Sequence, residues 1–207
     1  MTLYAATTNP GKLAEFATSA SGEGIEVLAL PDLASLPEPV EDAATFMGNA
    51  EIKALAYSLA APGLLVFADD SGLEVDALDG APGVRSARFA DDCRFDLHSH
   101  HRKDDRNNAC LLDLLSRLSF EPRTARFVCA LALARDGEVL LRATGNIEGE
   151  IIDTARGTNG FGYDPLFLIP TMDRTMAELP PGWKWKMSHR GEAFRELLRQ
   201  LRSSRLD

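Results

Sequence analysis

Two adjacent carboxylates, Asp69 and Asp70, are the residues of this chain whose arrangement most directly indicates chemistry. They follow the apolar run of residues 64–68, which is the pattern of a short buried strand, and they precede Ser71 and Gly72. Neighbouring carboxylates repel each other and lose hydration when buried. Mg²⁺ would offset that repulsion, since it binds one or two carboxylates together with phosphate oxygens, and either acid could then orient an attacking water. The alternative is a structural pair that caps a turn at Ser71 and Gly72, which we consider weaker because a cap needs only one acid.

The stretch TTNPGK, residues 7–12, predicts the start of a helix. Thr8 or Asn9 suits the N-cap, and Pro10 suits the first turn. A helix N-terminus exposes backbone N–H groups that can bind phosphate, and Lys12 adds a full positive charge beside them. The stretch lacks the glycine spacing and the following Ser or Thr of a Walker loop. Taken alone, the stretch is better interpreted as an ordinary capped helix.

A second predicted helix, residues 45–60, carries polar side chains on its inward face. Asn49 and Lys53 fall at helical spacing on the stripe that begins at Phe46. A lysine on that face is costly to bury unless it meets an anion, although its long stem could also reach solvent. Glu41 lies just upstream and supplies a further carboxylate.

The stretch GTNGFGYDP, residues 157–165, combines three glycines with two aromatic rings. Its glycines have neither the spacing nor the strand–turn–helix setting of a dinucleotide-binding fingerprint. The flat faces of Phe161 and Tyr163 could stack on a nucleobase, at about 1–3 kcal/mol per base. A plain core turn has the same composition, so both interpretations stay open.

Ser188 predicts the N-cap of the closing helix and places His189 and Arg190 in its first turn. An arginine at the positive end of a helix works against the helix dipole. We therefore expect these two donors to hold a carbonyl or phosphate oxygen.

Three histidines, His98, His100 and His101, lie close to Cys93 in a polar run. Their spacing fits no closed zinc template. We therefore expect a solvated loop there rather than a metal site.

The elements that must position these residues alternate between strands and helices, which predicts an α/β fold with a mixed sheet flanked by helices. Asp136 and Gly137 form the turn of a predicted hairpin, residues 125–144. Open α/β sheets bind ligands outside the carboxyl ends of their strands, and we expect the adjacent carboxylates at such an end. Residues 79–106 are expected to form a loop. The other predicted elements are, in chain order, a strand at 3–7, a helix starting near Asn9, a strand at 25–30, a helix at 45–60, strands at 64–68 and 147–152, and helices at 109–118 and 188–201.

Composition and charge limit the classes of function. The 207 residues are 45% hydrophobic and 26% charged, which is typical of a soluble globular protein and predicts a single domain, 1–207, or two lobes that share a core. A net charge of −9 disfavours a nucleic-acid partner, although basic residues that converge locally could still bind a small anion. No apolar run has the length of a membrane span, so we expect no membrane partner. The lack of a secretory pattern and the scattered cysteines favour a cytoplasmic location.

Taken together and in this order, five segments resemble the Ham1-like family of non-canonical purine nucleoside triphosphate pyrophosphatases, the inosine triphosphatases. The segments are TTNPGK, TFMGNAEIKA, ADDSGLEVDALDGAPGVRSARF, GFGYDP and SHR. The resemblance covers essentially the whole chain. It implies an elongated mixed sheet with helices, two lobes with an active-site cleft between them, and a homodimer. It also implies a Mg²⁺-dependent attack of water between the α- and β-phosphates of ITP, dITP or XTP, which yields a monophosphate and pyrophosphate.

Roles for individual residues are likewise implied by the resemblance, position by position. Asp70 would be the general base and, with Glu41, would bind the metal, while Lys53 would help to hold the triphosphate and Ser71 would touch the substrate. Counting back from His189 favours Lys184 over Lys186 as the lysine of the base and phosphate pocket. The triphosphate would be cradled by Thr7, Thr8, Asn9, Pro10, Gly11 and Lys12, and the pocket would be formed by Phe161, Gly162, Tyr163, Asp164, Lys184, His189 and Arg190.

Three other functions can be weighed against this one. A Maf-like enzyme would hydrolyse modified pyrimidine or other nucleotides, and the SHR and GFGYDP segments favour the purine substrate instead. A regulatory module that only binds nucleotides would not need the acid cluster of Glu41, Asp69 and Asp70. A haloacid-type phosphatase would need a DxD nucleophile pattern, which we do not find.

Overall fold

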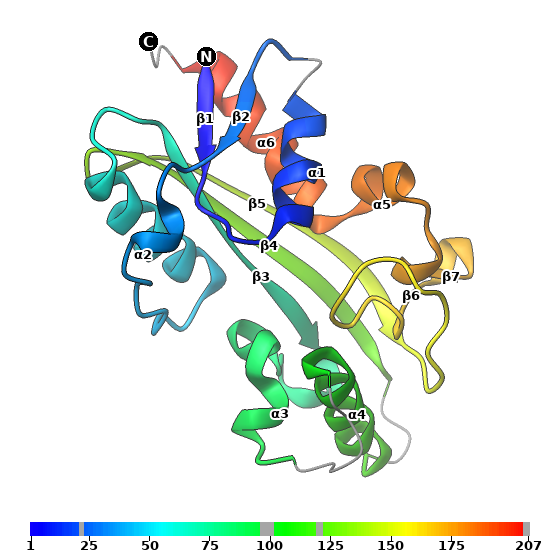
Figure 1. The fold of residues 1–207 in the computed structure, drawn as a ribbon. Coiled ribbons are helices and arrows are strands. Elements are labelled where there is room, and N and C mark those ends of the chain that lie inside the picture. The colour runs from blue at the N-terminus through cyan, green and yellow to red at the C-terminus, as the bar shows by residue number, and fades with distance from the viewer. Residues whose placement is uncertain (21–22, 96–101, 119–121, 205–207) are drawn as a thin grey trace. The chain divides into compact units, whose positions relative to one another are not determined.

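The computed structural model of this chain describes residues 1–20, 23–95, 102–118 and 122–204. Its strands form a seven-stranded mixed sheet in the order β2-β1-β3-β4-β5-β6-β7, with helices beside it (Figure 1). The predicted α/β class with a mixed sheet flanked by helices is confirmed. By its contacts the chain divides into two compact units, of which the first comprises Met1–Asp70, Cys129–Asn146 and Ser188–Asp207 and the second comprises Ser71–Val128 and Ile147–Met187. No helix among the described residues is both long and apolar enough to span a bilayer.

The first unit is built around parallel strands. β1 (Thr2–Ala5) pairs in parallel with β2 (Glu26–Ala29) on one side and with the start of β3 (Val66–Val75) on the other. The helices of this unit are α1 (Pro10–Ala20), α2 (Phe46–Ala60) and α6 (His189–Ser203). Its core contains three packed rings, Phe16 of α1, Phe67 of β3 and Phe194 of α6, whose centroids lie 4.9–5.6 Å apart. These contacts attach α1 and α6 to the strand that carries the two adjacent carboxylates (Figure 1).

The described part of the second unit contains the end of β3, three α-helices and the last two strands of the sheet. After β3 come two 3₁₀ turns, Asp76–Leu78 and Gly83–Arg88, and then α3 (Phe89–Asp92) and α4 (Lys103–Ser116). β6 (Phe167–Ile169) pairs antiparallel with both β5 and β7 (Arg174–Thr175), and α5 (Pro181–Met187) follows. The unit has a core of its own, whose large members include Leu73, Leu111, Leu115, Phe167 and Met176.

The hairpin prediction is confirmed, and its second strand is longer than expected. β4 (Thr124–Arg135) and β5 (Glu138–Ile151) are joined by Asp136 and Gly137, which have φ of 53° and 79°. Positive φ at both positions is what a two-residue hairpin turn of type I′ requires. The separate strand expected at 147–152 is wrong, since those residues are largely the continuation of β5.

Two other boundaries differ from the predicted ones. β3 does not end at Ala68, because it continues through Asp69 and Asp70 to Val75. Leu73 and Val75 are fully buried, so the strand extends to place them in the core of the second unit. The loop expected at 79–106 also contains regular structure, since the polar run after residue 101 forms the first turn of α4.

Candidate functional site

The N-terminus of α1 has the predicted cap. Asn9 Oδ1 accepts hydrogen bonds from the backbone N–H groups of Gly11 and Lys12, at 2.9 and 3.2 Å, and the Asn9 N–H donates to Thr7 Oγ1 at 3.2 Å. Of the two candidates, Asn9 is therefore the residue that caps the helix, with Pro10 in the first turn. The loop 7–9 is fixed ahead of a helix end, which is the geometry that suits an anion.

Lys12 lies against the first of the adjacent carboxylates. Its Nζ is 2.6 Å from Asp69 Oδ2, and Asp69 is only 5% exposed. Burial alone would raise the pKa of Asp69, but the nearby charges of Lys12, Arg190 and Lys53 hold that pKa well below its ordinary value. Asp69 is therefore an ionised partner of the cations around it, and the turn-capping alternative for this pair is wrong because β3 runs straight through both acids.

Lys53 meets the other acids. Its Nζ is 2.8 Å from Glu41 Oε2 and 3.9 Å from Asp70 Oδ1. Burial would lower the pKa of Lys53, but the surrounding carboxylates of Asp69, Asp70 and Glu41 raise it. The inward lysine of α2 thus meets anions rather than extending to solvent, and it places Glu41 and Asp70 around one positive charge.

Asp70 has a different environment from Asp69. Burial raises the pKa of Asp70 above that of an ordinary aspartate, against the opposing influence of Lys53 and of a hydrogen bond from Asn49. Asn49 Nδ2 donates to Asp70 Oδ2 at 3.0 Å. A carboxyl group whose pKa is shifted upward is better suited to accept a proton near neutral pH.

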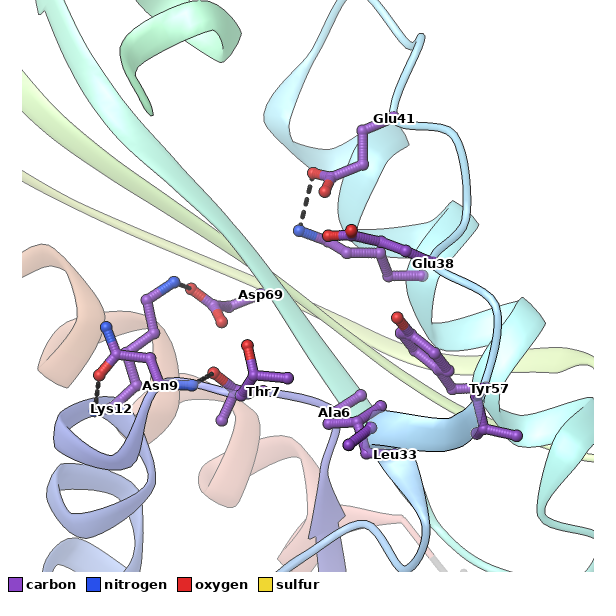
Figure 2. A pocket seen from close by; sticks show the side chains of 13 residues that line it. Ala6, Thr7, Asn9, Lys12, Leu33, Glu38, Glu41, Tyr57 and Asp69 are labelled. Atoms are coloured by element: carbon purple, nitrogen blue, oxygen red, sulfur yellow. Dashed lines mark hydrogen bonds and ion pairs between the residues drawn. The ribbon is translucent and has the colours of Figure 1, made fainter. Parts of the chain in front are cut away.

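A pocket of about 350 Å³ lies within the first unit beside Lys12, Lys53, Glu41 and Asp69, and its lining does not include Asp70 (Figure 2). Lys12, Asn9 and Thr7 lie on one side of the pocket, and Tyr57, Glu38 and Glu41 lie on the other. The predicted residues that line it are Thr7, Thr8, Asn9, Lys12, Glu41 and Lys53, together with Asp69. The lining residues that sequence reasoning missed are Ala6, Leu33, Ala34, Leu36, Glu38 and Tyr57.

The first turn of α6 holds two buried donors. Ser188 Oγ caps the helix by accepting from the Gly191 N–H at 3.0 Å, as predicted. His189 is 6% exposed, and Arg190 is 4% exposed with its Nη1 3.2 Å from Glu15 Oε2. The carboxylates of Glu15 and Asp69 offset the charge of an arginine at the positive end of a helix.

Gly145 of β5 allows the first turn of α6 to pack directly against this strand. A Cβ at this position would lie 2.4 Å from both the His189 carbonyl oxygen and the Ala193 nitrogen. The neighbouring Asn146 N–H donates to Glu192 Oε2 at 2.8 Å. The end of α6 that carries His189 and Arg190 is therefore held directly against the strand.

The aromatic loop belongs to the second unit, where its two rings have different positions. Tyr163 is buried, its hydroxyl donates to the Ser86 carbonyl at 2.9 Å, and burial raises the pKa of that hydroxyl. Phe161 is 44% exposed. The core-turn interpretation therefore describes the Tyr163 ring, while the face of Phe161 remains accessible.

Asp164 and Lys184 form an ion pair behind Phe161. Lys184 Nζ is 2.6 Å from Asp164 Oδ2 and 5.5 Å from the centroid of the Phe161 ring, and the Phe161 N–H donates to the same carboxylate oxygen at 2.9 Å. Lys184 is buried whereas Lys186 is exposed, in agreement with the choice made by counting back from His189. Gly160 is required here, because a Cβ would lie 2.1 Å from Asp164 Oδ2 and its φ is 84°.

Two side chains of α4 hold the aromatic loop and were not foreseen. Asp104 Oδ2 accepts from the Gly162 N–H at 2.8 Å, and Asn108 Nδ2 donates to the Gly162 carbonyl at 3.0 Å. Residues four apart share a helix face, so the spacing was present in the sequence. This shared face could have been recognised if the start of α4 had been predicted as a helix instead of as part of the loop at 79–106.

The acids of the first unit fit a hard divalent cation. Among the described residues, no group of three or more His, Cys, Asp or Glu could by itself hold a metal ion. Mg²⁺ does not need one, since it takes one or two carboxylates and completes its shell with water and phosphate oxygens. Glu41 and Asp70 already surround the ammonium group of Lys53, which shows that this place favours positive charge. His98, His100 and His101 lie outside the described residues.

Comparison with known proteins places the whole chain in one group. The model of the Ham1 family matches residues 3–200. The chain is 48% identical over 201 residues to a dITP/XTP pyrophosphatase of Acidobacterium capsulatum, covering 97% of this chain and 98% of that protein. It is 44% identical to a dITP/XTP pyrophosphatase of Geobacter sulfurreducens, with 93% and 92% covered.

Solved structures agree with this assignment. A HAM1 protein from Coxiella burnetii superposes with a TM-score of 0.85 at 36% identity, over 99% of this chain and all of that one. The Ham1 protein of Staphylococcus aureus superposes with a TM-score of 0.82 at 35% identity, over 98% and 99% of the two chains. The chain belongs to the Ham1 family.

Proposed function

We propose that this protein is a nucleoside triphosphate pyrophosphatase that hydrolyses non-canonical purine nucleotides, namely ITP, dITP and XTP, and so removes them from the nucleotide pool. The observation that carries the proposal is the pocket of the first unit, in which Lys12 and Lys53 each contact carboxylates beside a capped helix N-terminus. The pocket thereby combines cations for a polyphosphate with Glu41, and Asp70 lies next to it, 3.9 Å from Lys53 Nζ. The names of the relatives, dITP/XTP pyrophosphatases, support the choice of substrate.

The triphosphate binds along residues 7–12. The positive end of the α1 dipole and the ammonium groups of Lys12 and Lys53 offset its negative charge, while the Gly11 and Lys12 N–H groups are already bonded to Asn9 Oδ1. Asp69 keeps Lys12 in place through their 2.6 Å contact. Asp69 is therefore an anchor for the phosphate-binding lysine, while its neighbour Asp70 acts on the water.

Glu41 and Asp70 would hold the divalent cation that family membership implies, which we expect to be Mg²⁺. When bound, it neutralises charge that develops on the phosphate oxygens during the reaction.

Asp70 takes the proton of the attacking water. In the metal-free protein, burial raises the pKa of this carboxyl group. The water oxygen forms a new bond to phosphorus as the anhydride bond between the α- and β-phosphates breaks. One water is consumed, and the products are a nucleoside monophosphate and pyrophosphate.

Roles in base recognition are proposed for the remaining predicted residues of each unit separately. The exposed face of Phe161 can stack on a purine, with Lys184 and Asp164 holding the loop behind it. His189 and Arg190 donate to the 6-carbonyl of hypoxanthine or xanthine, where adenine has an amino group. Ser71 is proposed to contact the substrate, whereas Gly162 and the buried Tyr163 support the loop through their bonds to Asp104, Asn108 and Ser86.

The family resemblance further implies a homodimer that works in the cytoplasm. The net charge of −9 makes nucleic acid an unfavourable partner. The proposed partners are thus the free nucleotides and a second copy of the chain.

A nucleotide panel tests the proposed function. Values of kcat/KM are measured with Mg²⁺ for dITP, ITP, XTP, ATP, GTP and the pyrimidine triphosphates. We expect the three non-canonical purines to be hydrolysed far faster than the others. A preference for pyrimidine nucleotides would instead support the Maf-like activity, and nucleotide binding without turnover would support a regulatory module.

A further inference from the structure

Asn49 connects the two segments that carry the proposed metal ligands. It lies in the first turn of α2, is 1% exposed, and its amide makes two hydrogen bonds in opposite directions. Nδ2 donates to Asp70 Oδ2 at 3.0 Å, and Oδ1 accepts from the backbone N–H of Ala43 at 3.0 Å. Ala43 is two residues after Glu41, so one buried side chain links β3 to the loop that bears Glu41.

Gly48, which precedes Asn49, independently allows the loop that bears Glu41 to lie close to α2. A Cβ on Gly48 would be 2.6 Å from the Cβ of Ala43, a distance at which the loop would have to move. Asn49 does not cap α2. The cap is Thr45, whose Oγ1 accepts a hydrogen bond from the Gly48 N–H at 3.1 Å. Asn49 is therefore available for a different task.

Only a carboxamide suits the position of Asn49. It must donate to a carboxylate and accept from a backbone N–H at the same time, which aspartate cannot do because it lacks a donor when ionised. A leucine of similar volume could make neither bond. The choice of asparagine is therefore explained by its two hydrogen bonds, to an acid and to a main-chain N–H, and not by its volume in the core.

We propose that Asn49 is a positioning residue that holds Glu41 and Asp70 in the mutual orientation a divalent cation needs, with Gly48 giving the Glu41 loop the room to approach. The inference rests on the proposed function, because the cation is the one that the pyrophosphatase reaction uses. Partners that orient metal ligands are typically worth about 10- to 100-fold in metal affinity or activity when they are removed.

Three variants of α2 test this role. Asn49→Leu keeps the side-chain volume and removes both hydrogen bonds. Gly48→Ala leaves Asn49 intact and displaces the loop through Ala43. The control is Ser58→Ala on the same helix, because Ser58 is fully buried and hydrogen bonded to the Leu55 carbonyl and the Gly137 N–H, and therefore contacts neither ligand segment.

Two quantities are measured for each protein after circular dichroism has shown that it is folded. One is the Mg²⁺ concentration that gives half-maximal release of pyrophosphate from dITP. The other is Mn²⁺ binding, followed without turnover by the electron paramagnetic resonance signal of free Mn²⁺. We expect Asn49→Leu and Gly48→Ala to need at least about tenfold more Mg²⁺ and to bind Mn²⁺ correspondingly more weakly. Ser58→Ala should match the wild type in both.

The outcomes separate this inference from the function on which it rests. If the wild type releases no pyrophosphate with Mg²⁺, the proposed function fails. If the wild type is active and folded Asn49→Leu has an unchanged Mg²⁺ requirement or an unchanged Mn²⁺ affinity, the inference is overturned. If Asn49→Leu does not fold, Gly48→Ala decides in the same way, and wild-type metal affinity in that variant overturns the inference.

Discussion

Asp69 and Asp70 are neighbours in β3, yet their surroundings predict different effects when each is replaced by asparagine. Asp69 is 5% exposed and receives the Lys12 ammonium at 2.6 Å. A hydrogen bond to a charged group contributes about 1.5–3 kcal/mol, and because the Lys12 side chain is 19% exposed we expect the lower part, about 1.5–2 kcal/mol. In a chain of this length 1 kcal/mol changes Tm by about 2–4 °C, so Asp69→Asn should lower Tm by about 3–8 °C.

Asp70→Asn should instead spare stability and remove turnover. Burial raises the pKa of Asp70, which means that the folded protein disfavours the ionised carboxylate relative to the unfolded chain. A neutral amide removes that penalty, so the Tm of the metal-free variant should be equal to or above that of the wild type. Turnover should fall by about 10²–10⁴-fold, which is the usual scale for the loss of a general base.

The assay compares thermal unfolding in EDTA with steady-state kinetics on dITP and Mg²⁺. Asp91→Asn is a suitable control, because its ion pair with Arg106 is exposed and should be worth at most about 1 kcal/mol. The reasoning is refuted if Asp69→Asn unfolds at the wild-type temperature while Asp70→Asn is strongly destabilised. Near-normal turnover of Asp70→Asn would show that another group is the base.

Three further results are expected. Removal of Mg²⁺ with EDTA should abolish hydrolysis and Mg²⁺ alone should restore it, whereas stoichiometric zinc that is lost on mutation of His98, His100 and His101 would contradict the solvated-loop prediction. Arg190→Ala should reduce the preference for ITP over ATP and leave the preference for ITP over GTP much less changed, because guanine shares the 6-carbonyl; equal losses of kcat/KM on ITP and ATP would show that Arg190 holds phosphate instead. Of the three cysteines, the exposed Cys93 should be alkylated first in the folded protein at pH 8, because burial raises the pKa of the Cys110 and Cys129 thiols to about 12, and mass spectrometry that finds Cys129 modified first would refute this.

Features set by a few adjacent residues could be predicted from the sequence. The caps at Asn9 and Ser188 and the turn at Asp136 and Gly137 depend on local hydrogen bonds and backbone angles, which short motifs specify. The inward orientation of Lys53 followed from helical spacing alone.

Features that depend on contacts distant in sequence could not be predicted. Asp-Asp-Ser-Gly has the composition of a turn, but β3 continues through it because Leu73 and Val75 are buried further on. The pairing of Lys12 with Asp69 joins residues 57 positions apart, and no local pattern indicates it. For the same reason the residue pattern alone did not distinguish the two adjacent acids, and only the family resemblance assigned the base and metal-binding roles to Asp70.

The central claim is that Asp70 drives cleavage between the α- and β-phosphates of a non-canonical purine nucleotide. The most direct test is ³¹P nuclear magnetic resonance of dITP incubated with Mg²⁺ and either the wild type or Asp70→Asn. The wild type should produce dIMP and pyrophosphate in equal amounts, with no orthophosphate, and the variant should produce neither at a comparable rate. Formation of dIDP and orthophosphate by the wild type, or equal rates for the two proteins, would contradict the claim.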